Sequence, residues 1–538
     1  MFFCAFWSFW LLVGAWAGAW SIEGPDFDVA AALLEKGVDL ADLGLSNFTQ
    51  RSEGSTCTVT CFSLRLLFGT DRVLPPGTSA YNSSAQHYWS NIPAAATPSC
   101  IFRPEDAESV GVFVLLARLT DCPFAIKSGG HAAFANASST SSGITLSLEN
   151  ITDISLSQDR QYAAIGAGNR WIDVYNALSP QNLTVIGGRA SDVGVGGLTL
   201  GGGISFFSSM YGWACDNVAS FEVVTACGDI VIASPTQNQN LFSALRGGGA
   251  NFGIVTRFNL LTYSLPNGTM WGGTRAYLSD QFPAVTNAFT ELSRNTALDP
   301  KAGHWLTFTN VAGMNIAAAE LWYANADGNN APIFANYSAI PAISNDTQPR
   351  NLSAYSIRVD APDPYGVRQY FYTMTFKNDY DLHLAGKDIF FANTNLTDVS
   401  GSLIVMTYQS ISVPQLQRMA KNGGNSLPLS PDSGPLTIAL IYCRWDDAKD
   451  DAKVYKAASD TFNGIKREAV VRNLDVDYLY MNYASQYQDV VASYGSAHKQ
   501  RLLEIAEQYD PQGIFQTLTP GGFKLARAPL PSPNYFSF

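Results

Sequence analysis

The sequence predicts an α+β fold with more than one domain. One helix pattern is followed by several short strand patterns, and two glycine-rich segments interrupt strand-like sequence. Strands that follow a helix in a run are typical of α+β proteins, whereas a doubly wound α/β sheet alternates the two. No GxGxxG follows a strand, so the dinucleotide fingerprint of the doubly wound fold is absent. A chain of 538 residues with 46% hydrophobic side chains is long enough to bury more than one core.

The composition excludes several classes of protein. Charged side chains make up only 14% of the chain, below the roughly 25% of an average soluble domain. The net charge is −12, so a nucleic acid or an anionic membrane would repel the chain rather than bind it. The high apolar content excludes a disordered chain. We therefore expect an acidic globular protein without a nucleic-acid partner.

The first residues of the sequence bear on export from the cell. Residues 1–19 contain no charged side chain and end in Ala17-Gly18-Ala19, the small-x-small pattern that precedes a signal-peptidase cut. The apolar run is also close to the roughly 20 residues of a membrane span, so an uncleaved anchor is the alternative. We expect cleavage, secretion and no further membrane contact.

Sequons and cysteines agree with a secretory route. Asn-x-Ser/Thr sequons indicate a glycosylated surface. They lie at Asn47, Asn82, Asn136, Asn150, Asn182, Asn267, Asn336, Asn345, Asn351 and Asn395. Eight cysteines become seven if the leader with Cys4 is removed, and an odd number leaves at least one without a partner in the chain. We expect Cys61 to pair with Cys100, with Cys57 as the competing partner.

The next elements form the first domain. A helix is expected from Pro104, because proline in the first turn forfeits no helical hydrogen bond and three acidic residues suit the positive end of the helix dipole. A short apolar strand then runs into the glycine turn of PFAIKSGGH. Strand patterns follow at 144–148, 154–156 and 163–165.

Two glycine-rich segments follow within this domain. They read VIGGRASDVGVGGLTLGGG over 185–203 and LRGGGANFGIVTRFNL over 245–260. A flexible linker is the plain alternative, but linkers lack interleaved Val, Ile and Leu. We therefore interpret both segments as cradles in which the backbone approaches a ligand closely.

Several catalytic motifs are absent. The chain has no GxxxxGK[ST] loop and no GxSxG elbow, and its five histidines lack metal-ligand spacing, so we expect no metal site. His131 differs from the other histidines because it follows Ser128-Gly129-Gly130 at the end of a predicted strand. A hydrogen-bonded turn histidine is the default interpretation, and the two glycine cradles favour a ligand contact instead.

A family resemblance emerges from these motifs taken in order. KSGGH, AAIGAGNRWIDVY, DVGVGGLTLGGG and ALRGGGANFGIVTRF resemble the FAD-binding domain of the vanillyl-alcohol-oxidase/PCMH flavoproteins. LYMNYASQYQ and the later YDPQGIF are similar to the berberine-bridge-enzyme branch, and the layout resembles its secreted fungal members. The resemblance implies an FAD domain of two α+β subdomains and a substrate domain whose antiparallel sheet is covered by helices.

The resemblance also divides the chain. After the leader at 1–19, an N-terminal segment at 20–93 packs on the FAD-binding domain at 94–266. The substrate-binding domain covers 267–472, and a berberine-bridge-like segment at 473–538 returns to the FAD domain.

The cofactor residues are carried over by position. The histidine of the GGH motif is bonded to the 8α carbon of the flavin in the family, which implies a covalent link at His131. A second, cysteine tether is not expected, because Ala190 stands at that position and Leu198 stands where relatives have a histidine. The other expected cofactor contacts are Lys127, Ser128, Gly129, Gly130, Val193, Gly194, Gly196, Gly197, Gly253, Ile254, Val255 and Asn482.

The catalytic residues are expected in the motif YMNY. Hydride transfer to a flavin needs a base that takes a proton from the substrate, and the resemblance implies Tyr483 as that base with Tyr480 beside it. The alternative is that both tyrosines only pack in the pocket wall. Val193 occupies a position where a small residue admits O2, which favours an oxidase. On the substrate side, Tyr408, Gln409 and Arg444 are candidates, although core packing explains them equally well.

Three functions remain open at this point. The first is an FAD-linked oxidase of a small alcohol, sugar or secondary metabolite, with O2 as electron acceptor. The second is an oxidative cyclase of secondary metabolism, and the third is a non-catalytic FAD-binding scaffold. The oligomeric state is not predicted.

Overall fold

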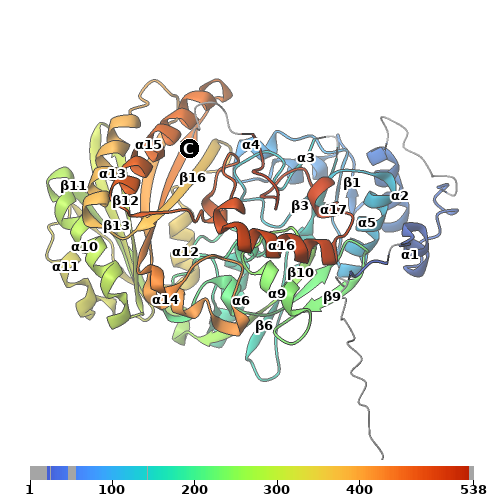
Figure 1. Cartoon of the computed structure of the whole chain (residues 1–538), viewed down its shortest axis with the longest axis horizontal. Coiled ribbons are helices and arrows are strands. Elements are labelled where there is room, and N and C mark those ends of the chain that lie inside the picture. The colour runs from blue at the N-terminus through green and yellow to red at the C-terminus, as the bar shows by residue number, and fades with distance from the viewer. Residues whose placement is uncertain (1–20, 25, 46–55, 142, 532–538) are drawn as a thin grey trace, which may run out of the picture.

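The computed structural model of the chain describes residues 21–24, 26–45, 56–141 and 143–531. Its elements form three β-sheets with helices around them, and a large sheet with its helices fills the left half of Figure 1. This arrangement confirms the predicted α+β fold.

The first sheet has four strands in the order β1-β2-β4-β3. They are β1 (Val73–Leu74), β2 (Cys100–Phe102), β3 (Phe124–Lys127) and β4 (Ile144–Ser147). β2 and β3 both run parallel to β4, and the helix α5 (Ala107–Thr120) connects them. The expected start of this helix at Pro104 is wrong by one turn, because the Asp106 carboxylate caps the helix by accepting from the backbone N–H of Ser109 at 2.8 Å.

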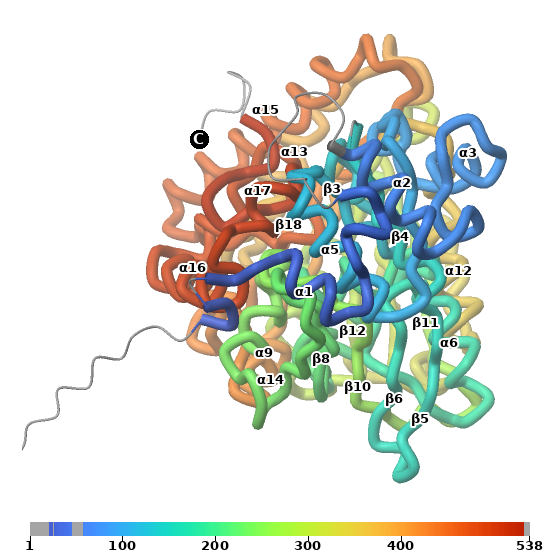
Figure 2. Tube along the Cα trace, turned by 90° about the vertical axis from the view of Figure 1, so that its right-hand side faces the viewer, coloured from blue at the N-terminus to red at the C-terminus, as the bar shows by residue number. Residues whose placement is uncertain are grey.

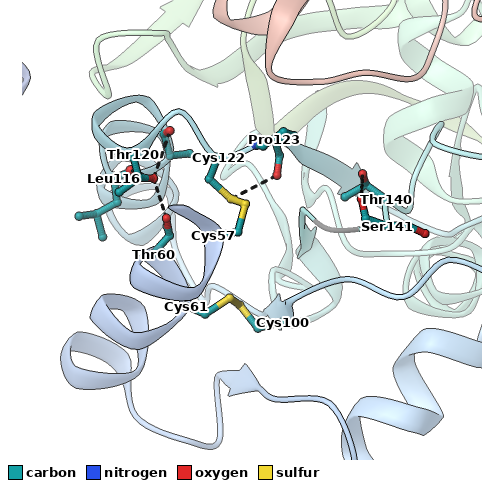
Figure 3. The surroundings of a disulfide bond; sticks show 11 residues. Cys57, Thr60, Cys61, Cys100, Leu116, Thr120, Cys122, Pro123, Thr140 and Ser141 are labelled. Atoms are coloured by element: carbon teal, nitrogen blue, oxygen red, sulfur yellow. Dashed lines mark hydrogen bonds between the residues drawn. A yellow bond between two sulfur atoms is a disulfide. The ribbon is translucent and has the colours of Figure 1, made fainter. Parts of the chain in front are cut away.

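Two disulfides fasten this sheet to the helix α2 (Thr56–Phe68) (Figure 3). Cys61 is bonded to Cys100 at the start of β2, which is the expected pair. Cys57 is bonded to Cys122 just after α5, a partner that the sequence analysis did not identify. Both bridges leave the same face of α2, because the cysteines are four residues apart in a helix.

The second sheet is antiparallel, in the order β5-β6-β10-β8-β9, with β7 also paired to β10. Its strands are β5 (Ile154–Leu156), β6 (Tyr162–Gly166), β7 (Leu183–Val185), β8 (Val218–Val224), β9 (Ile230–Ala233) and β10 (Ile254–Ser264). The first glycine-rich segment leads from β7 into the short helix α7 (Val195–Leu200), and the second leads into β10. Both therefore lie at ends of strands and helices rather than in a linker.

The third sheet is a nine-stranded antiparallel sheet. Its order is β14-β11-β13-β12-β17-β18-β16-β19, with β15 also paired to β11. The strands are β11 (Thr269–Leu278), β12 (Ala302–Val311), β13 (Met314–Tyr323), β14 (Ser344–Asn345), β15 (Gln348–Asn351), β16 (Arg368–Lys377), β17 (Leu403–Ile411), β18 (Leu436–Trp445) and β19 (Asp475–Val476).

One face of the large sheet is covered by α10 (Phe282–Asn295), α13 (Tyr380–Asn393) and α15 (Asp451–Val471) (Figure 1). Side chains alternate along each strand. Leu306 and Phe308 of β12 are buried in the core under these helices, whereas Trp305 and Thr307 point to the opposite face and line a cavity. The free face of the sheet is therefore available for a site.

The remaining helices surround these sheets. They are α1 (Val29–Glu35), α3 (Ser79–Gln86), α4 (Asn91–Ala94), α6 (Trp171–Leu178), α8 (Ser208–Tyr211), α9 (Gln239–Leu245), α11 (Ala335–Ser338), α12 (Leu352–Asp360), α14 (Val413–Arg418), α16 (Ser496–Tyr509) and α17 (Ile514–Thr517). α16 lies against α9 (Figure 2), and its Tyr509 hydroxyl donates to Asn240 Oδ1 at 3.0 Å. The start of the described chain joins the same place, where the Ile22 N–H donates to the Gln508 carbonyl at 2.9 Å.

Two features bear on the expected secretion. Within the described ranges, every helix is too short or too polar to cross a bilayer, and the expected leader at 1–19 lies outside those ranges. The asparagines of most described sequons are exposed, while Asn136 is half-buried and Asn47 lies outside the described residues.

Candidate functional site

A cavity of about 630 Å³ lies where the three sheets meet. Its walls come from the SGGH turn after β3, the segment around α7, the start of β10, the free face of the large sheet and residues 480–486. Segments more than 300 residues apart in the chain therefore build one site, and most of the residues expected to bind the cofactor line it.

The SGGH turn after β3 and the glycine-rich segment before α7 touch backbone to backbone. A Cβ added at Gly129 would lie 2.5 Å from the Gly194 nitrogen, and one at Gly194 would lie 2.3 Å from the Gly129 nitrogen. No side chain fits between them, so glycine is required at both positions. Gly197 also lines the cavity, and a Cβ added there would meet nothing within 4 Å. Its surface is therefore open for a ligand.

The SGGH turn presents free hydrogen-bond donors. The backbone N–H groups of Gly129, Gly130, His131 and Ala132 donate to no acceptor in the ranges that the structure describes. Gly130 has a left-handed backbone with φ of 73°. Successive free N–H groups in such a turn bind anions. The pyrophosphate oxygens of FAD would be suitable acceptors for these donors, and the apolar cavity walls would suit its flat ring, so the residues present fit this cofactor.

His131 lines the cavity with an imidazole that lies flat on an indole. Its ring stacks on Trp89 with centroids 4.3 Å apart and an angle of 12° between the planes. Burial lowers the pKa of His131 to about 4, because an apolar environment disfavours the charged form. At neutral pH this imidazole is uncharged and one ring nitrogen keeps its lone pair.

Lys127, which was expected to contact the cofactor, does not line the cavity. Its ammonium donates to the Ser84 carbonyl at 2.9 Å and lies 4.3 Å from the centre of the Tyr88 ring, away from the cavity. The reason is the alternation of side chains in β3, which turns Ile126 and Ser128 to the cavity and Lys127 to the other side.

The motif YMNY forms a 3₁₀ turn over Met481–Tyr483, not a strand. This turn brings both tyrosines to the cavity, with their rings edge to face at 4.8 Å between centroids. The Tyr480 oxygen accepts from the backbone N–H groups of Gly203 and Ile204 at 3.2 and 3.1 Å. The amide of Asn482 donates to Tyr480 and to the Leu198 carbonyl, both at 3.0 Å. Tyr480 and Asn482 thus hold the segment after α7 in place.

Tyr483 lies in a different set of contacts. Its hydroxyl oxygen accepts from Arg189 Nη2 at 2.7 Å and from Gln409 Nε2 at 3.1 Å. Arg189 Nη2 also donates to Gln409 Oε1 at 2.6 Å, and the guanidinium lies 4.8 Å from the centre of the Trp305 ring. A buried cation is therefore fixed against the oxygen of the expected base.

Of the three substrate-side candidates, the structure places only Gln409 in the cavity wall. Tyr408 lies on the opposite face of β17, where its hydroxyl donates to the His383 carbonyl under α13. Arg444 donates to the Pro362 carbonyl at 2.8 Å and does not line the cavity. Strand alternation thus places Tyr408 and its neighbour Gln409 on opposite faces of β17.

Several cavity residues were missed by the sequence analysis. Arg189 carried a signal, since it is a lone charge within a glycine-rich, apolar stretch. Asp360 and Asp363 carried none, because they lie at the end of α12 and in the unremarkable loop after it, and reach the cavity only by packing. Burial raises the pKa of Asp360 to about 6, and burial together with the charge of Asp360 does the same for Asp363.

The expected tether positions and metal sites can also be compared with the structure. Ala190, Val193 and Leu198 all line the cavity. The cysteines that form no disulfide within the described residues, Cys215, Cys227 and Cys443, are buried and do not line it. No cluster of His, Cys, Asp and Glu in the described part of the chain is arranged to hold a metal ion.

Comparisons with known proteins agree with the geometry. Residues 98–234 match the family model of an FAD binding domain. The chain is 33% identical over 482 residues to the FAD-dependent monooxygenase drtC of Aspergillus calidoustus, covering 87% of this chain and 91% of that protein.

Solved structures share the fold. The 6-hydroxy-D-nicotine oxidase of Arthrobacter nicotinovorans superposes with a TM-score of 0.69 at 20% identity, covering 83% of this chain and 96% of that one. The berberine bridge enzyme of Eschscholzia californica superposes with a TM-score of 0.69 at 15% identity, covering 85% and 97%. The chain therefore belongs to the family of the fungal FAD-dependent monooxygenases, with an FAD binding domain at 98–234, and it shares its fold with the berberine bridge enzyme.

Proposed function

We propose that this oxidoreductase is a secreted oxidase of a small alcohol, sugar or secondary metabolite. In this proposal FAD is attached covalently to His131 alone, and O2 takes the electrons and is released as hydrogen peroxide. The observation that carries the proposal is the convergence of Arg189, Gln409 and Tyr483 in the wall of a cavity that the SGGH turn also lines.

Bound FAD supplies the acceptor for a hydride, and the chain itself handles the proton. Tyr483 accepts the proton of the substrate hydroxyl. The Arg189 guanidinium donates to the Tyr483 oxygen and so stabilises the anionic form that accepts this proton. Gln409 donates to the same oxygen and fixes its direction. The aromatic rings of Trp305 and Phe371 exclude water around these groups.

His131 and the SGGH turn provide the attachment. An uncharged imidazole at the cavity edge is a nucleophile at neutral pH, and the free N–H groups of the turn hold the cofactor's negative charge. The absence of a thiol at Ala190 and the apolar side chain of Leu198 support a single link.

Two further elements of the proposal rest on position and exposure. Val193 lines the cavity beside the glycine segment, where a side chain of modest size leaves room for O2. The exposed sequons and the two disulfides support passage through an oxidising secretory compartment, with removal of residues 1–19.

The test begins with the purified, yellow holoprotein. After acid denaturation and proteolysis, a flavin-mass adduct on the His131 peptide is expected. Anaerobic addition of alcohols, sugars and phenolic metabolites identifies the substrate by bleaching of the flavin absorbance, and hydrogen peroxide is then measured in air. A simple carbonyl product supports the proposal. A product with a new ring would assign the chain to oxidative cyclisation instead, and a fully dissociable flavin would remove the covalent link.

A further inference from the structure

The segment His87-Tyr88-Trp89-Ser90 packs directly on the SGGH turn. The Trp89 N–H donates to the Gly130 carbonyl at 3.1 Å. A Cβ added at Gly130 would lie 3.2 Å from the His87 carbonyl oxygen and from the Tyr88 ring. The turn that carries His131 is therefore shaped by a segment more than forty residues earlier in the chain.

The imidazole of His131 has one strong orienting contact. Within the described residues its ring nitrogens bond to no other residue, only to the backbone of His131 itself, and the ring lies flat on Trp89 at 4.3 Å and 12°. Flat stacking of this kind covers one face of the imidazole. Rotation of the ring out of this plane would break the stacking, so the indole fixes the plane in which the imidazole meets the cavity.

Trp89 is itself held from the side of the large sheet. The Gln369 side chain donates to the Trp89 carbonyl at 2.6 Å and accepts from the Tyr442 hydroxyl at 2.6 Å. The indole stacks on Phe371 of β16 at 5.0 Å and on Tyr442 of β18 at 5.8 Å, and it is only 2% exposed. The position of the indole is thus fixed by the substrate-side sheet.

We propose that Trp89 is a positioning residue for flavin attachment, which aligns the imidazole of His131 for bond formation and sets the rate of that reaction. This inference rests on the proposed covalent link at His131. The sheet that faces the substrate then also governs attachment of the cofactor, through Gln369, Tyr442 and the indole.

The reaction that Trp89 would align joins the imidazole to the flavin and is oxidative overall. A bond forms between an imidazole nitrogen and the 8α-methyl carbon of the flavin, one methyl C–H bond breaks, and the imidazole N–H proton is lost. The electron pair of the broken C–H bond reduces the flavin ring, and dissolved O2 takes that pair, with two protons, to give hydrogen peroxide. A nucleophile that is misplaced by about 1 Å loses on the order of 10²-fold in rate.

The experiment compares covalent flavin in four proteins. Wild type, Trp89→Leu, Trp89→Phe and the control Trp445→Leu are purified from riboflavin-starved cells and given FAD. Acid-stable flavin on the protein is followed with time, and the Tm of each protein is measured in parallel. Trp445 is a suitable control because it is another fully buried indole, in the core under the helices and outside the cavity.

We expect attachment to slow by roughly tenfold to a hundredfold in Trp89→Leu, with a smaller effect in Trp89→Phe, which keeps a flat face. Trp445→Leu is expected to lower Tm while attaching flavin at the wild-type rate. Attachment in Trp89→Leu at the wild-type rate would overturn the inference, as would an equal slowing in both leucine variants. If Trp89→Leu does not fold, Trp89→Met takes its place, with the same expectation relative to Trp89→Phe. Wild-type protein without any acid-stable flavin would instead overturn the covalent link itself.

Discussion

Arg189 connects the two halves of the candidate active site. Its main chain belongs to the glycine-rich segment before α7, and its guanidinium reaches Tyr483 after β19 and Gln409 on β17. The residue is 9% exposed, and a buried cation needs charged or strongly polar partners. A phenol oxygen and an amide oxygen are those partners, and in the proposed function they place the cation beside the base.

Loss of the Tyr483 hydroxyl is expected to slow the chemical step. In Tyr483→Phe we expect kcat to fall by about 10²–10⁴-fold, the usual contribution of a general base, while FAD content stays unchanged. Anaerobic stopped-flow reduction of the flavin measures this step directly. The matched control is Tyr478→Phe, because the Tyr478 hydroxyl is buried, has no hydrogen-bond partner among the residues that the structure describes and lies outside the cavity. Equal flavin reduction rates in Tyr483→Phe and wild type would exclude Tyr483 as the base.

Replacement of the Arg189 guanidinium tests whether the cation that donates to the Tyr483 oxygen contributes to the reaction. Arg189→Met is expected to lower kcat/KM by on the order of 10²-fold, because removal of one partner of a buried charged hydrogen bond costs a few kcal/mol. Arg189→Lys restores the charge without the planar fork and should recover part of the loss. Steady-state kinetics on both variants decide the point, and identical kinetics for methionine and lysine would show that the charge plays no part.

At the scale of single residues, the sequence predicted many of the residues expected around the cofactor. It predicted few of those that line the cavity on the side of the large sheet. Gly129, Gly194 and His131 lie in motifs whose glycines are required by close backbone contact. Asp360 is placed by bonds to the Ser191 hydroxyl and the Asp192 N–H, residues that are far away in the chain. No local pattern encodes such a contact, because it depends on how two domains dock.

The large sheet is the element that separates the site from the core. Alternate residues of β12, β17 and β18 face the helices or the cavity, so one strand serves stability and function at once. This alternation explains why Tyr408 was a poor candidate and Gln409 a good one, whereas Arg444 shares the face of Tyr442 but its side chain turns to the Pro362 carbonyl. The period of two was legible in the sequence, but which of the two faces would meet the cavity was not, since both faces are apolar.

The helix side of this sheet holds two buried histidines that predict acid sensitivity. Burial lowers the pKa of His304 and of His383 to about 3, while the unfolded chain takes up these protons near pH 6.5. Between those values the unfolded state binds more protons, so the free energy of unfolding falls as pH drops from about 6.5 toward 3.

The pH dependence of the free energy of unfolding can be compared between wild type and a histidine variant. Each histidine is expected to remove up to about 1.4 kcal/mol per pH unit within this window. Urea unfolding at pH 7, 6, 5 and 4 is compared between wild type and His383→Gln, whose amide can keep bonds to Thr290 and Thr437. The variant should show a shallower loss on acidification. Parallel curves for the two proteins would contradict the assignment of this pH dependence to His383.

At the scale of the whole molecule, the cavity exists only when all three sheets are assembled. The segment at 480–486 closes it after the last strand of the large sheet, and α16 and α17 then return to the flavin-binding half (Figure 1). The resemblance of the segment at 473–538 implied that the tail returns to the FAD domain, but the α9 contact that receives it could not be read from local sequence.

The disulfides are expected to stabilise the N-terminal part of this assembly. Cys57 and Cys122 close a loop of 65 residues, so their replacement by serine in a double variant should cost about 2–4 kcal/mol of the free energy of unfolding. Urea unfolding under non-reducing conditions measures this cost. Cys227→Ala, which alters a buried cysteine without a disulfide, serves as the control, and a double variant as stable as this control would contradict the prediction.

Glu23 near the start of the described chain forms a buried ion pair with Arg118 at 2.6 Å, next to the bond from Ile22 to Gln508. This seam joins the opening residues to a helix made more than 480 residues later. During synthesis at about 5–20 residues per second, those opening residues wait roughly half a minute to a minute and a half for their neighbour to emerge from the ribosome. Docking at this seam is consequently among the last events of biogenesis, and until then a carboxylate and a guanidinium destined for the interior remain in water.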